Sequence, residues 1–441
     1  MDDESKINSR IAGFFKKSVE ERQNIIQKLC NLNQEDLDYI KGSTDILDKA
    51  GQGHYIENTI AVMQVPLGIA TNFAINGTDY LVPMAIEEAS VVAAASNSAK
   101  IARVSGGFFT STTPPIMIGQ IQMINVPDPY NAREKILEHE QEIVELANKQ
   151  DPILVKFGGG CQGINVKVLT NTMKGAMVIT ELLVDVRDAM GANAVNTMNE
   201  AVAPLLEKII GGQALLRIIS NLADRRLVRA RAVFNANELE TENMKGEEVV
   251  NGILNAYAFA EADPYRCSTH NKGIMNGIDA VAIATAQDWR AIEAGAHTYA
   301  AVKVTGKYSS LTTWEKDGNG DLVGTIELPL AIGLVGGVAR IHPLAQISFK
   351  ILGLSVPGGA LKLAEIMAAV GLAQNFGALR ALATVGIQAG HMKLHARNLA
   401  ASMGAKGTII DKIIDKISER KLKVTYDTVK EIYDEVQGES E

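Results

Sequence analysis

Five segments of the sequence gather polar and ionisable side chains beside glycines, a composition that is common in pockets where chemistry takes place. They read PMAIEEAS (83–90), RDAMGANAVN (187–196), RCSTHNKGIMNGID (266–279), ATAQDWRA (284–291) and GHMKLHARN (390–398). The second lies near an expected helix start, where backbone N–H groups can receive a phosphate. Each segment alone is weak evidence, because a Glu-Glu pair before a helix is usually a solvated first turn and a lone histidine is usually structural. Their chemistry depends on the elements that bring them together.

One glycine-rich segment is a poor candidate for chemistry. Residues 158–163 read GGGCQG, a formal match to the G-x-G-x-x-G of dinucleotide-binding Rossmann folds. That fingerprint must close a strand and open a helix, whereas here the strand-like INVKVL follows at once. We therefore expect a tight glycine turn at this place and no Rossmann domain.

Residues 115–220 have the periodicities of a separate folding unit. IMIGQIQMINV alternates as a strand does, and AREKILEHEQEIVELANK has apolar residues at helical spacing. INVKVLTN and AMVITELLVDV follow as strands, then NAVNTMNEAVAPLLEKII as a helix and ALLRIIS as a strand. The order β-α-β-β-α-β is that of a ferredoxin-like fold. The unit is flanked by segments of a different texture, so it is expected to be inserted into a larger, discontinuous domain.

The flanking segments give further local predictions. Ser18 is a plausible N-cap for a helix that starts VEERQ, and Asn76-Gly77 is a strong hairpin signal because both residues tolerate positive φ. RLVRARAVF, from Arg226, alternates between small or apolar residues on one face and arginines on the other. The stretch 386–441 is lysine- and isoleucine-rich and predicts a separate helical piece, joined through glycine, that could act as a mobile flap.

Composition limits the function classes. The chain has 441 residues, 46% of them hydrophobic, which suggests two or three domains with a large core. Its net charge of −8 argues against nucleic-acid binding. The three cysteines have no disulfide or metal spacing, and the sequence has neither a signal peptide nor an apolar run long enough to span a membrane. We therefore expect a cytoplasmic protein with no membrane partner.

Taken together and in order, the polar segments resemble those of one enzyme family. PMAIEEASVVAA, DAMGANAVNTMNE, HNKGIMNGIDAVAIATAQDWRA and GHMKLHARN, with EN-T-I at residues 57–60, look like class II 3-hydroxy-3-methylglutaryl-CoA (HMG-CoA) reductases. The resemblance covers the chain from about Ser9 to Asn398. It implies an α+β fold with a large helical HMG-CoA-binding domain around central strands (1–114 and 221–385). It also implies a ferredoxin-like NAD(P)-binding domain (115–220) and a C-terminal flap (386–441).

The resemblance also implies the reaction and its catalytic residues. HMG-CoA and mevalonate plus CoA would be interconverted by two hydride transfers, through mevaldyl-CoA and mevaldehyde. The family's catalytic residues fall on Glu88, Lys272, Asp288 and His391. Lys272 would stabilise the oxyanion, and Glu88 would donate a proton, which requires a pKa raised by burial. Asp288 would link these two, and His391 on the flap would protonate the CoA thiolate, with His395 as its nearest competitor.

The family's binding positions carry over in the same way. The hydroxymethylglutaryl group would be held by Ser90, Asn221, Arg266 and Asn276, and CoA would contact Arg10. The dinucleotide would be lined by Asp151, Asp188, Ala189, Met190, Gly191 and Asn193. Because a carboxylate at Asp151 would repel a 2′-phosphate, NADH is favoured over NADPH, although Lys156 nearby could pair with that phosphate. No metal is expected.

The resemblance further implies a homodimer, which could assemble into a hexamer, with the active site at the subunit interface and Glu57 in that interface. Two rival readings stay open at this point. A CoA-dependent acyl transferase or condensing enzyme would need a nucleophilic cysteine beside a histidine, and Cys267 is the only tempting candidate. A non-catalytic relative would keep the fold, but it would have no chemical need to retain all four catalytic residues.

Overall fold

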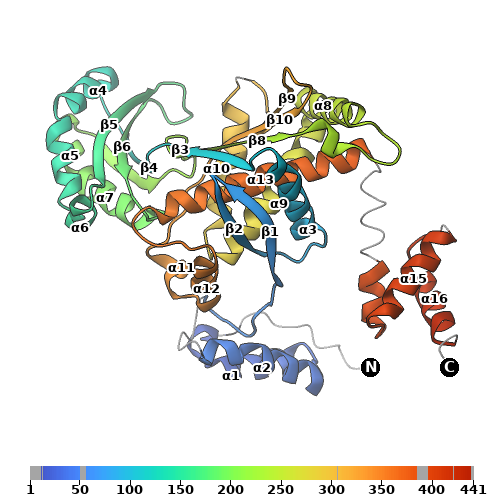
Figure 1. Ribbon diagram of the computed structural model, residues 1–441. Coiled ribbons are helices and arrows are strands. Elements are labelled where there is room, and N and C mark those ends of the chain that lie inside the picture. The colour runs from blue at the N-terminus through green and yellow to red at the C-terminus, as the bar shows by residue number, and fades with distance from the viewer. Residues whose placement is uncertain are drawn as a thin grey trace. The chain divides into compact units, whose positions relative to one another are not determined.

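The structure, a computed structural model, describes residues 11, 13–49, 56–304, 306–384, 396–420 and 422–438 (Figure 1). His391, His395 and Arg10 lie outside the described residues. The chain forms two compact units, one made of 1–66 with 341–343 and the other of 67–340 with 344–441.

The first unit contains the 3-10 helix η1 (Phe14–Lys16) and two helices, α1 (Val19–Leu29) and α2 (Gln34–Lys49). Ser18 caps α1 in a capping box, because its Oγ accepts from Glu21 N and its own N–H donates to the Glu21 carboxylate. This confirms the predicted N-cap. The buried Arg22 donates to Thr59 O at 2.9 Å, and Gln23 donates to Ile60 O at 2.8 Å. These two side chains hold segment 56–60 against α1.

The core of the second unit is built on a six-stranded sheet with the order β2-β1-β3-β8-β10-β9. Its strands are β1 (Leu67–Ile75), β2 (Thr78–Ala85), β3 (Phe108–Thr112), β8 (Leu227–Phe234), β9 (Thr312–Lys316) and β10 (Leu322–Pro329). Asn76 and Gly77 both have positive φ between β1 and β2, so the predicted hairpin is confirmed.

One face of this sheet packs on the 25-residue helix α13 (Gly359–Ala383). On β8, Val228, Ala230, Ala232 and Phe234 are buried as predicted, and the Phe234 ring stacks on Phe376 of α13 at 3.7 Å between centroids. Helix α13 is long and apolar enough to cross a membrane, but two thirds of its most apolar stretch is buried. It is therefore the core helix of this unit.

Several further helices belong to this part of the chain. They are α3 (Val91–Val104), η2 (Ala236–Leu239), α8 (Gly246–Ala262), α9 (Pro264–Ala284), α10 (Trp289–Val302), α11 (Gly337–Ile341) and α12 (Pro343–Ile351). Helix α9 packs closely on α13 at Gly277, where a Cβ would lie 3.0 Å from side-chain atoms of Val370 and Gln374.

Residues 116–219 form a second sheet with its own core, at the left of Figure 1. Strands β4 (Ile116–Ile124), β5 (Gly160–Leu169), β6 (Met177–Asp185) and β7 (Gln213–Ile219) pair antiparallel in the order β5-β6-β4-β7. The helices are α4 (Pro129–Glu138), α5 (Glu140–Asn148), α6 (Pro152–Lys156) and α7 (Ala192–Ile210). Element order and strand order are those of a ferredoxin-like unit. GGGCQG runs into β5, so the rejection of a Rossmann site there is confirmed.

The C-terminal residues have a third, small apolar core. Helices α15 (Thr408–Glu419) and α16 (Tyr426–Gly438) pack on each other through Ile413, Ile417 and Ile432. Ala396 and Ala400, on a preceding helical turn, complete this core.

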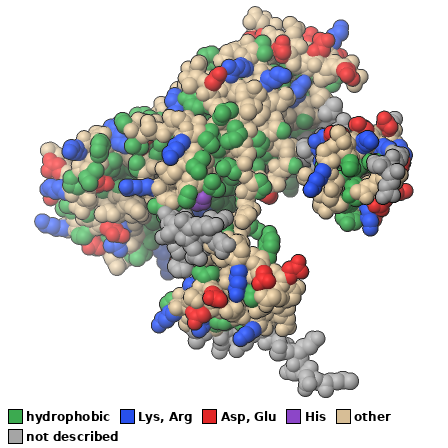
Figure 2. Space-filling view, turned by 60° about the horizontal axis from the view of Figure 1, so that its bottom comes forward, with side chains coloured by type: hydrophobic (Ala, Val, Ile, Leu, Met, Phe, Trp, Pro, Cys, Tyr) green, Lys and Arg blue, Asp and Glu red, His purple; other side chains and the backbone are tan. Residues whose placement is uncertain are grey.

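Apolar side chains also reach the surface of the second unit. On the face shown in Figure 2, hydrophobic side chains gather in the middle, and charged side chains lie mostly toward the edges. Helices α11 and α12 contribute one stripe of exposed aliphatic residues, which consists of Val338, Leu344, Ile347 and Ile351.

Candidate active site

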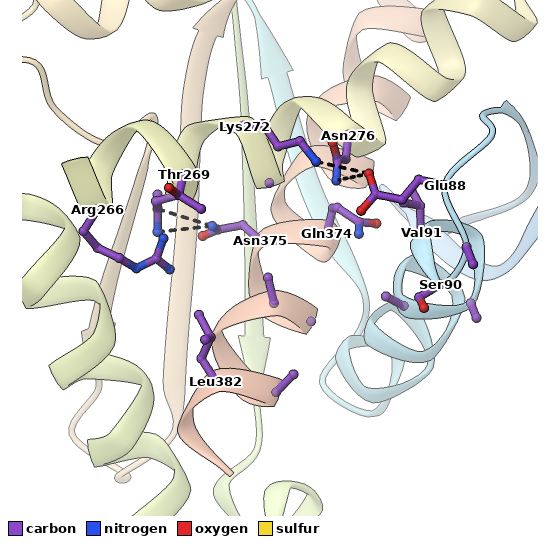
Figure 3. A pocket seen from close by; sticks show the side chains of 18 residues that line it. Glu88, Ser90, Val91, Arg266, Thr269, Lys272, Asn276, Gln374, Asn375 and Leu382 are labelled. Atoms are coloured by element: carbon purple, nitrogen blue, oxygen red, sulfur yellow. Dashed lines mark hydrogen bonds and ion pairs between the residues drawn. The ribbon is translucent and has the colours of Figure 1, made fainter. Parts of the chain in front are cut away.

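Helices α3, α9 and α13 enclose a cavity of about 570 Å³ in the second unit. Figure 3 shows its lining, which comes from the turn before α3, from one face of α9 and from the C-terminal half of α13. Glu88, Ser90, Arg266, Lys272 and Asn276 all line it. Five residues that the sequence analysis named are therefore brought together from segments far apart in the chain.

Glu88 is the meeting point of two polar side chains of α9. Its carboxylate lies 3.1 Å from Lys272 Nζ and 3.4 Å from Asn276 Nδ2, and both point toward it in Figure 3. Lys272 and Asn276 are one helical turn apart, so they share a face of α9. The burial expected for Glu88 is not present within this chain, where its side chain is 38% exposed.

Ser90 and Arg266 have polar groups available for a ligand. Ser90 precedes α3 with a φ of 78°, and its shielded Oγ has no hydrogen-bond partner among the described residues. A buried hydroxyl without a partner is costly unless a ligand completes it. The Arg266 guanidinium is half-buried, which lowers its pKa, and it pairs with no carboxylate in the described part of the chain. An unpaired guanidinium suits a carboxylate, which it can bind in bidentate fashion.

A buried polar network forms one wall of the cavity. His270 Nε2 lies 2.8 Å from Ser310 Oγ, 3.0 Å from Thr312 Oγ1 and 3.2 Å from Asn375 Nδ2. Asn375 Oδ1 accepts from Thr312 and from Trp314 Nε1. Burial, reinforced by the charge of Arg266, lowers the pKa of His270 to about 4. The imidazole is therefore neutral at physiological pH and ties α9 to α13 and β9.

Asp288 lies beyond the C-terminal end of α9. This helix ends in a Schellman arrangement, in which Gln287 N donates to Ala282 O and Ala286 N donates to Ile283 O. Asp288 then caps α10 by accepting from Ala291 N, and its carboxylate pairs with Arg290 at 3.0 Å. It does not line the cavity that holds Glu88.

The turn 187–191, which we call the dinucleotide turn, leads into α7. Gly191 has a φ of 103° at the N-cap, and no side chain caps the first amides of α7. A Cβ at Gly191 would lie 2.6 Å from a Val186 methyl, so a side chain cannot fill this space. Uncapped amides at the start of a 19-residue helix fit a phosphate group.

Other members of the predicted dinucleotide set are partly engaged by the protein itself. Both Asp188 carboxylate oxygens accept from backbone amides at the start of α13, those of Gly358 and Ala360. Asp151 caps α6 with one oxygen, which accepts from Leu154 N. Asp188 therefore shapes the turn through its side chain, and Asp151 keeps one oxygen for other partners.

Asn221 does not line the cavity either; it lies at the end of the small sheet, where its carbonyl accepts from Ala223 N. Asn375, which lines the wall of the cavity, was not predicted from the sequence. Its signal was the pair Gln374-Asn375 inside an otherwise apolar helix. The described residues contain no group of three His, Cys, Asp or Glu that could hold a metal ion.

Cys267, the residue of the rival transferase reading, is unsuited to nucleophilic catalysis. Its side chain is fully buried, and burial raises the pKa of the thiol to about 11. A reactive cysteine requires the opposite shift.

Comparisons with known proteins identify the family of this chain. The family model for hydroxymethylglutaryl-coenzyme A reductase matches residues 18–396. A 3-hydroxy-3-methylglutaryl-coenzyme A reductase of Archaeoglobus fulgidus is 54% identical over 98% of this chain and 96% of its own. A probable reductase of this name from Borreliella burgdorferi is 32% identical over 97% of this chain and 96% of its own. The class II enzyme of Streptococcus pneumoniae, solved bound to NADPH in open conformations, is 37% identical, covers 96% of this chain and all of its own, and has a TM-score of 0.73. With a family model that spans most of its length and relatives that match it almost from end to end, the chain belongs to the hydroxymethylglutaryl-coenzyme A reductases, in their class II form.

Proposed function

We propose that the cavity between α3, α9 and α13 is where this chain interconverts HMG-CoA with mevalonate and CoA, the NAD(P)H-dependent reaction of its family. The observation that supports this most directly is the cluster around Glu88, where Lys272 Nζ and Asn276 Nδ2 meet one carboxylate. Arg266 lines the same cavity, and its guanidinium pairs with no carboxylate of the residues that the structure describes. A thioester carbonyl beside Lys272 and a carboxylate on Arg266 would fit the two ends of a hydroxymethylglutaryl group.

The roles of the residues follow from their chemistry. Each reduction places negative charge on the carbonyl oxygen, and the Lys272 ammonium stabilises that charge. Glu88, in contact with Lys272, supplies the proton to the same oxygen. Ser90 and Asn276 orient the substrate through hydrogen bonds. His391, on the C-terminal segment, protonates the departing CoA thiolate.

The bound dinucleotide supplies the hydride for each reduction. The uncapped first turn of α7, with Gly191 and Asn193, holds its phosphates, while Ala189 and Met190 line it through their backbone. The free oxygen of Asp151 accepts from the 2′-OH of the adenosine ribose, which favours NADH over NADPH. Replacing Asp151 with Asn removes the charge, so the ratio of kcat/KM for NADPH to that for NADH should rise.

We further propose that Asp288 acts on the Glu88–Lys272 pair of a second subunit. From Lys272 to the last residue of α9 is 12 residues, or about 18 Å of helix, and Asp288 lies four residues farther on. One chain therefore holds Lys272 and Asn276 in the middle of α9, whereas Asp288 lies beyond its C-terminal end. A homodimer that brings Asp288 of each chain to the Glu88–Lys272 pair of the other would complete two sites, and it would also bury Glu88.

The surface of the chain supports this assembly. The stripe Val338, Leu344, Ile347 and Ile351 leaves aliphatic side chains in water, and exposed apolar surface of this kind is typical of interfaces. Arg10 stays a proposed contact of CoA, carried over from the family.

The first experiment follows oxidation of NADH and NADPH at 340 nm with HMG-CoA for the wild type and for Lys272→Ala. We expect the variant to lose activity by about 10²- to 10³-fold. The matched control is Lys307→Ala, which also breaks a lysine–carboxylate pair, with Glu261 at 2.8 Å, but away from the cavity. Full activity in Lys272→Ala would contradict the proposal.

The shared site has its own test, by co-expression of Lys272→Ala with Asp288→Ala. Each chain alone should be inactive. In a mixed dimer one of the two sites combines an intact Lys272 with an intact Asp288, so random pairing should restore about a quarter of wild-type activity. No restoration would show that both residues act within one chain.

A further inference from the structure

Residues 285–288, which we call the Asp288 loop, connect α9 to α10. The side chain of Gln287 joins this loop to a neighbouring backbone segment. Its Nε2 donates to Gly333 O at 2.9 Å, and its Oε1 accepts from Gly333 N at 2.8 Å. The same Nε2 also donates to Thr285 O at 3.0 Å. A side-chain amide thus pairs with both backbone groups of one residue, as a neighbouring strand would. All of these groups are buried, so without these bonds they would have no hydrogen-bond partner, because water does not reach them.

Gly333 in turn lies directly against the dinucleotide turn. A Cβ at Gly333 would be 2.4 Å from Met190 N and 2.7 Å from the carbonyl carbon of Ala189, so only glycine fits there. The next residue, Leu334, donates its N–H to Asp188 O at 2.9 Å, and Ala189 bridges with Val335. Residues 330–335 therefore lie between the Asp288 loop and the dinucleotide turn and contact both.

The other side of the turn is held by a buried arginine. Arg226 donates to Ala189 O at 3.0 Å and to Ile332 O at 2.6 Å, and so links the turn to the same 330–335 segment. The turn is thus fixed by Arg226 on one side and by Gly333 on the other. Gln287 is the only side chain among the described residues that hydrogen-bonds to Gly333.

We propose that Gln287 is a positioning residue that sets the dinucleotide turn relative to Asp288. Because Gln287 is adjacent to Asp288, its bonds to Gly333 fix the distance between the acidic side chain and the turn that receives the dinucleotide. Its effect passes through Gly333 to Met190, and Gln287 itself touches neither ligand. This inference rests on the proposed function, in which the turn holds the dinucleotide and Asp288 takes part in catalysis.

The test measures binding without turnover. Gln287→Met keeps the length of the side chain but leaves Gly333 N and O without partners. Gly333→Ala changes the packing of Gly333 against the turn, because the added Cβ would push on Met190 N. The matched control is Gln346→Met, which removes a part-buried side-chain amide bond to a backbone carbonyl, Ala339 O at 2.8 Å, that involves neither the turn nor Gly333. For each protein, dissociation constants for NADH and for HMG-CoA are measured by fluorescence titration and calorimetry, together with the melting temperature.

We expect Gln287→Met to raise the dissociation constant for NADH by about tenfold, the loss expected when a buried hydrogen-bonded pair is left open. The dissociation constant for HMG-CoA should stay within about twofold, because Arg266 and Lys272 are untouched. Gln346→Met should change neither constant, even if its melting temperature falls as much. A Gln287→Met protein that binds NADH as the wild type does would overturn the inference, as would an equal weakening of both ligands.

The failure of the proposed function can be told apart by Asn193→Asp. This variant places a negative charge at the first turn of α7, where it would repel a phosphate. If it weakens NADH binding and Gln287→Met does not, the turn binds the dinucleotide and only the positioning role is wrong. If neither variant changes NADH binding, the dinucleotide site itself is misassigned, and the inference falls with it.

Discussion

Acid should destabilise the protein through His270, and the size of the effect can be worked from its surroundings. The imidazole is buried among Ser310, Thr312 and Asn375, and its pKa is lowered from 6.5 to about 4. As the pH falls below 6.5, the unfolded chain takes up a proton at this position that the folded chain refuses. Stability is therefore lost progressively between pH 6.5 and pH 4.

The linkage relation gives the magnitude. A shift from 6.5 to about 4 removes about 2 kcal/mol of stability between pH 7 and pH 5, and about 3 kcal/mol in total below pH 4. Wild-type data alone do not isolate this loss, because Asp279 shifts in the opposite direction. Burial and the neighbouring Glu293 raise the pKa of Asp279, so that carboxyl favours the folded state at lower pH.

The assay therefore compares the wild type with His270→Gln, in which an amide can take over the hydrogen bonds of Nε2 but cannot titrate. Unfolding free energies at pH 7 and pH 5 come from urea titrations followed by tryptophan fluorescence. The chain has two tryptophans, so a Trp289→Phe background leaves Trp314, whose indole N–H donates to Asn375 in the same network. The signal then reports on the region that contains His270.

The wild type should lose about 2 kcal/mol more than His270→Gln between pH 7 and pH 5. Parallel pH dependences, within about 0.5 kcal/mol, would refute the reasoning. They would mean that the imidazole is either protonated in the folded state or hydrated there, in spite of its burial.

Three further outcomes are expected. Cys267→Ser should keep its activity at 340 nm, since a thiol whose pKa is about 11 carries almost no thiolate at neutral pH; a loss of more than about tenfold with an unchanged fold would revive the transferase reading. Arg226→Lys should lower the unfolding free energy by about 3 kcal/mol, because one ammonium cannot reach both Ala189 O and Ile332 O; calorimetry that finds no change would contradict this. The wild type should lose stability as the pH rises through the raised pKa of Asp279, and Asp279→Asn should remove this loss. Melting temperatures of both proteins from pH 6 to pH 9 test this, and the same pH dependence in both would contradict it.

The local parts of the fold could be predicted because short-range chemistry determines them. Ser18 and Glu21 lie three residues apart and form a capping box with no help from the rest of the chain. Asn76-Gly77 makes its hairpin for the same kind of reason. The ferredoxin-like unit followed from periodicity, because its strands alternate and its helices have one apolar face.

The long central helices were less visible. Residues 264–284 contain Gly273 and Gly277, and glycine is a poor helix former, yet both lie inside α9. Gly277 is there because α13 approaches too closely for a side chain, and such a contact between distant segments leaves no local trace. The predicted single helix over residues 132–149 is in fact two, α4 and α5, which meet at His139.

The candidate site, too, could be predicted from the sequence only in part. The residue types around Glu88 and Lys272 were recognised from their segments, and the structure brings those two together. The separation of Asp288 from them could not be read from the sequence, because it depends on α9 being one uninterrupted helix. The role of Gln287 depends on Gly333, 46 residues away, so no spacing rule could have identified it.

The polar network around His270 also limits which substitutions this protein can accept during evolution. Loss of any one member leaves the others buried without a partner, at about 1–3 kcal/mol, a large fraction of the stability of a typical domain. Exchange of several members at once for apolar residues of similar shape would cost far less. His270, Ser310, Thr312, Trp314 and Asn375 should therefore be inherited as one unit, so that lineages keep all five or replace several in a concerted step. Chimeras that take α9 from one such lineage and β9 or α13 from another should fold poorly, however similar the parents are elsewhere.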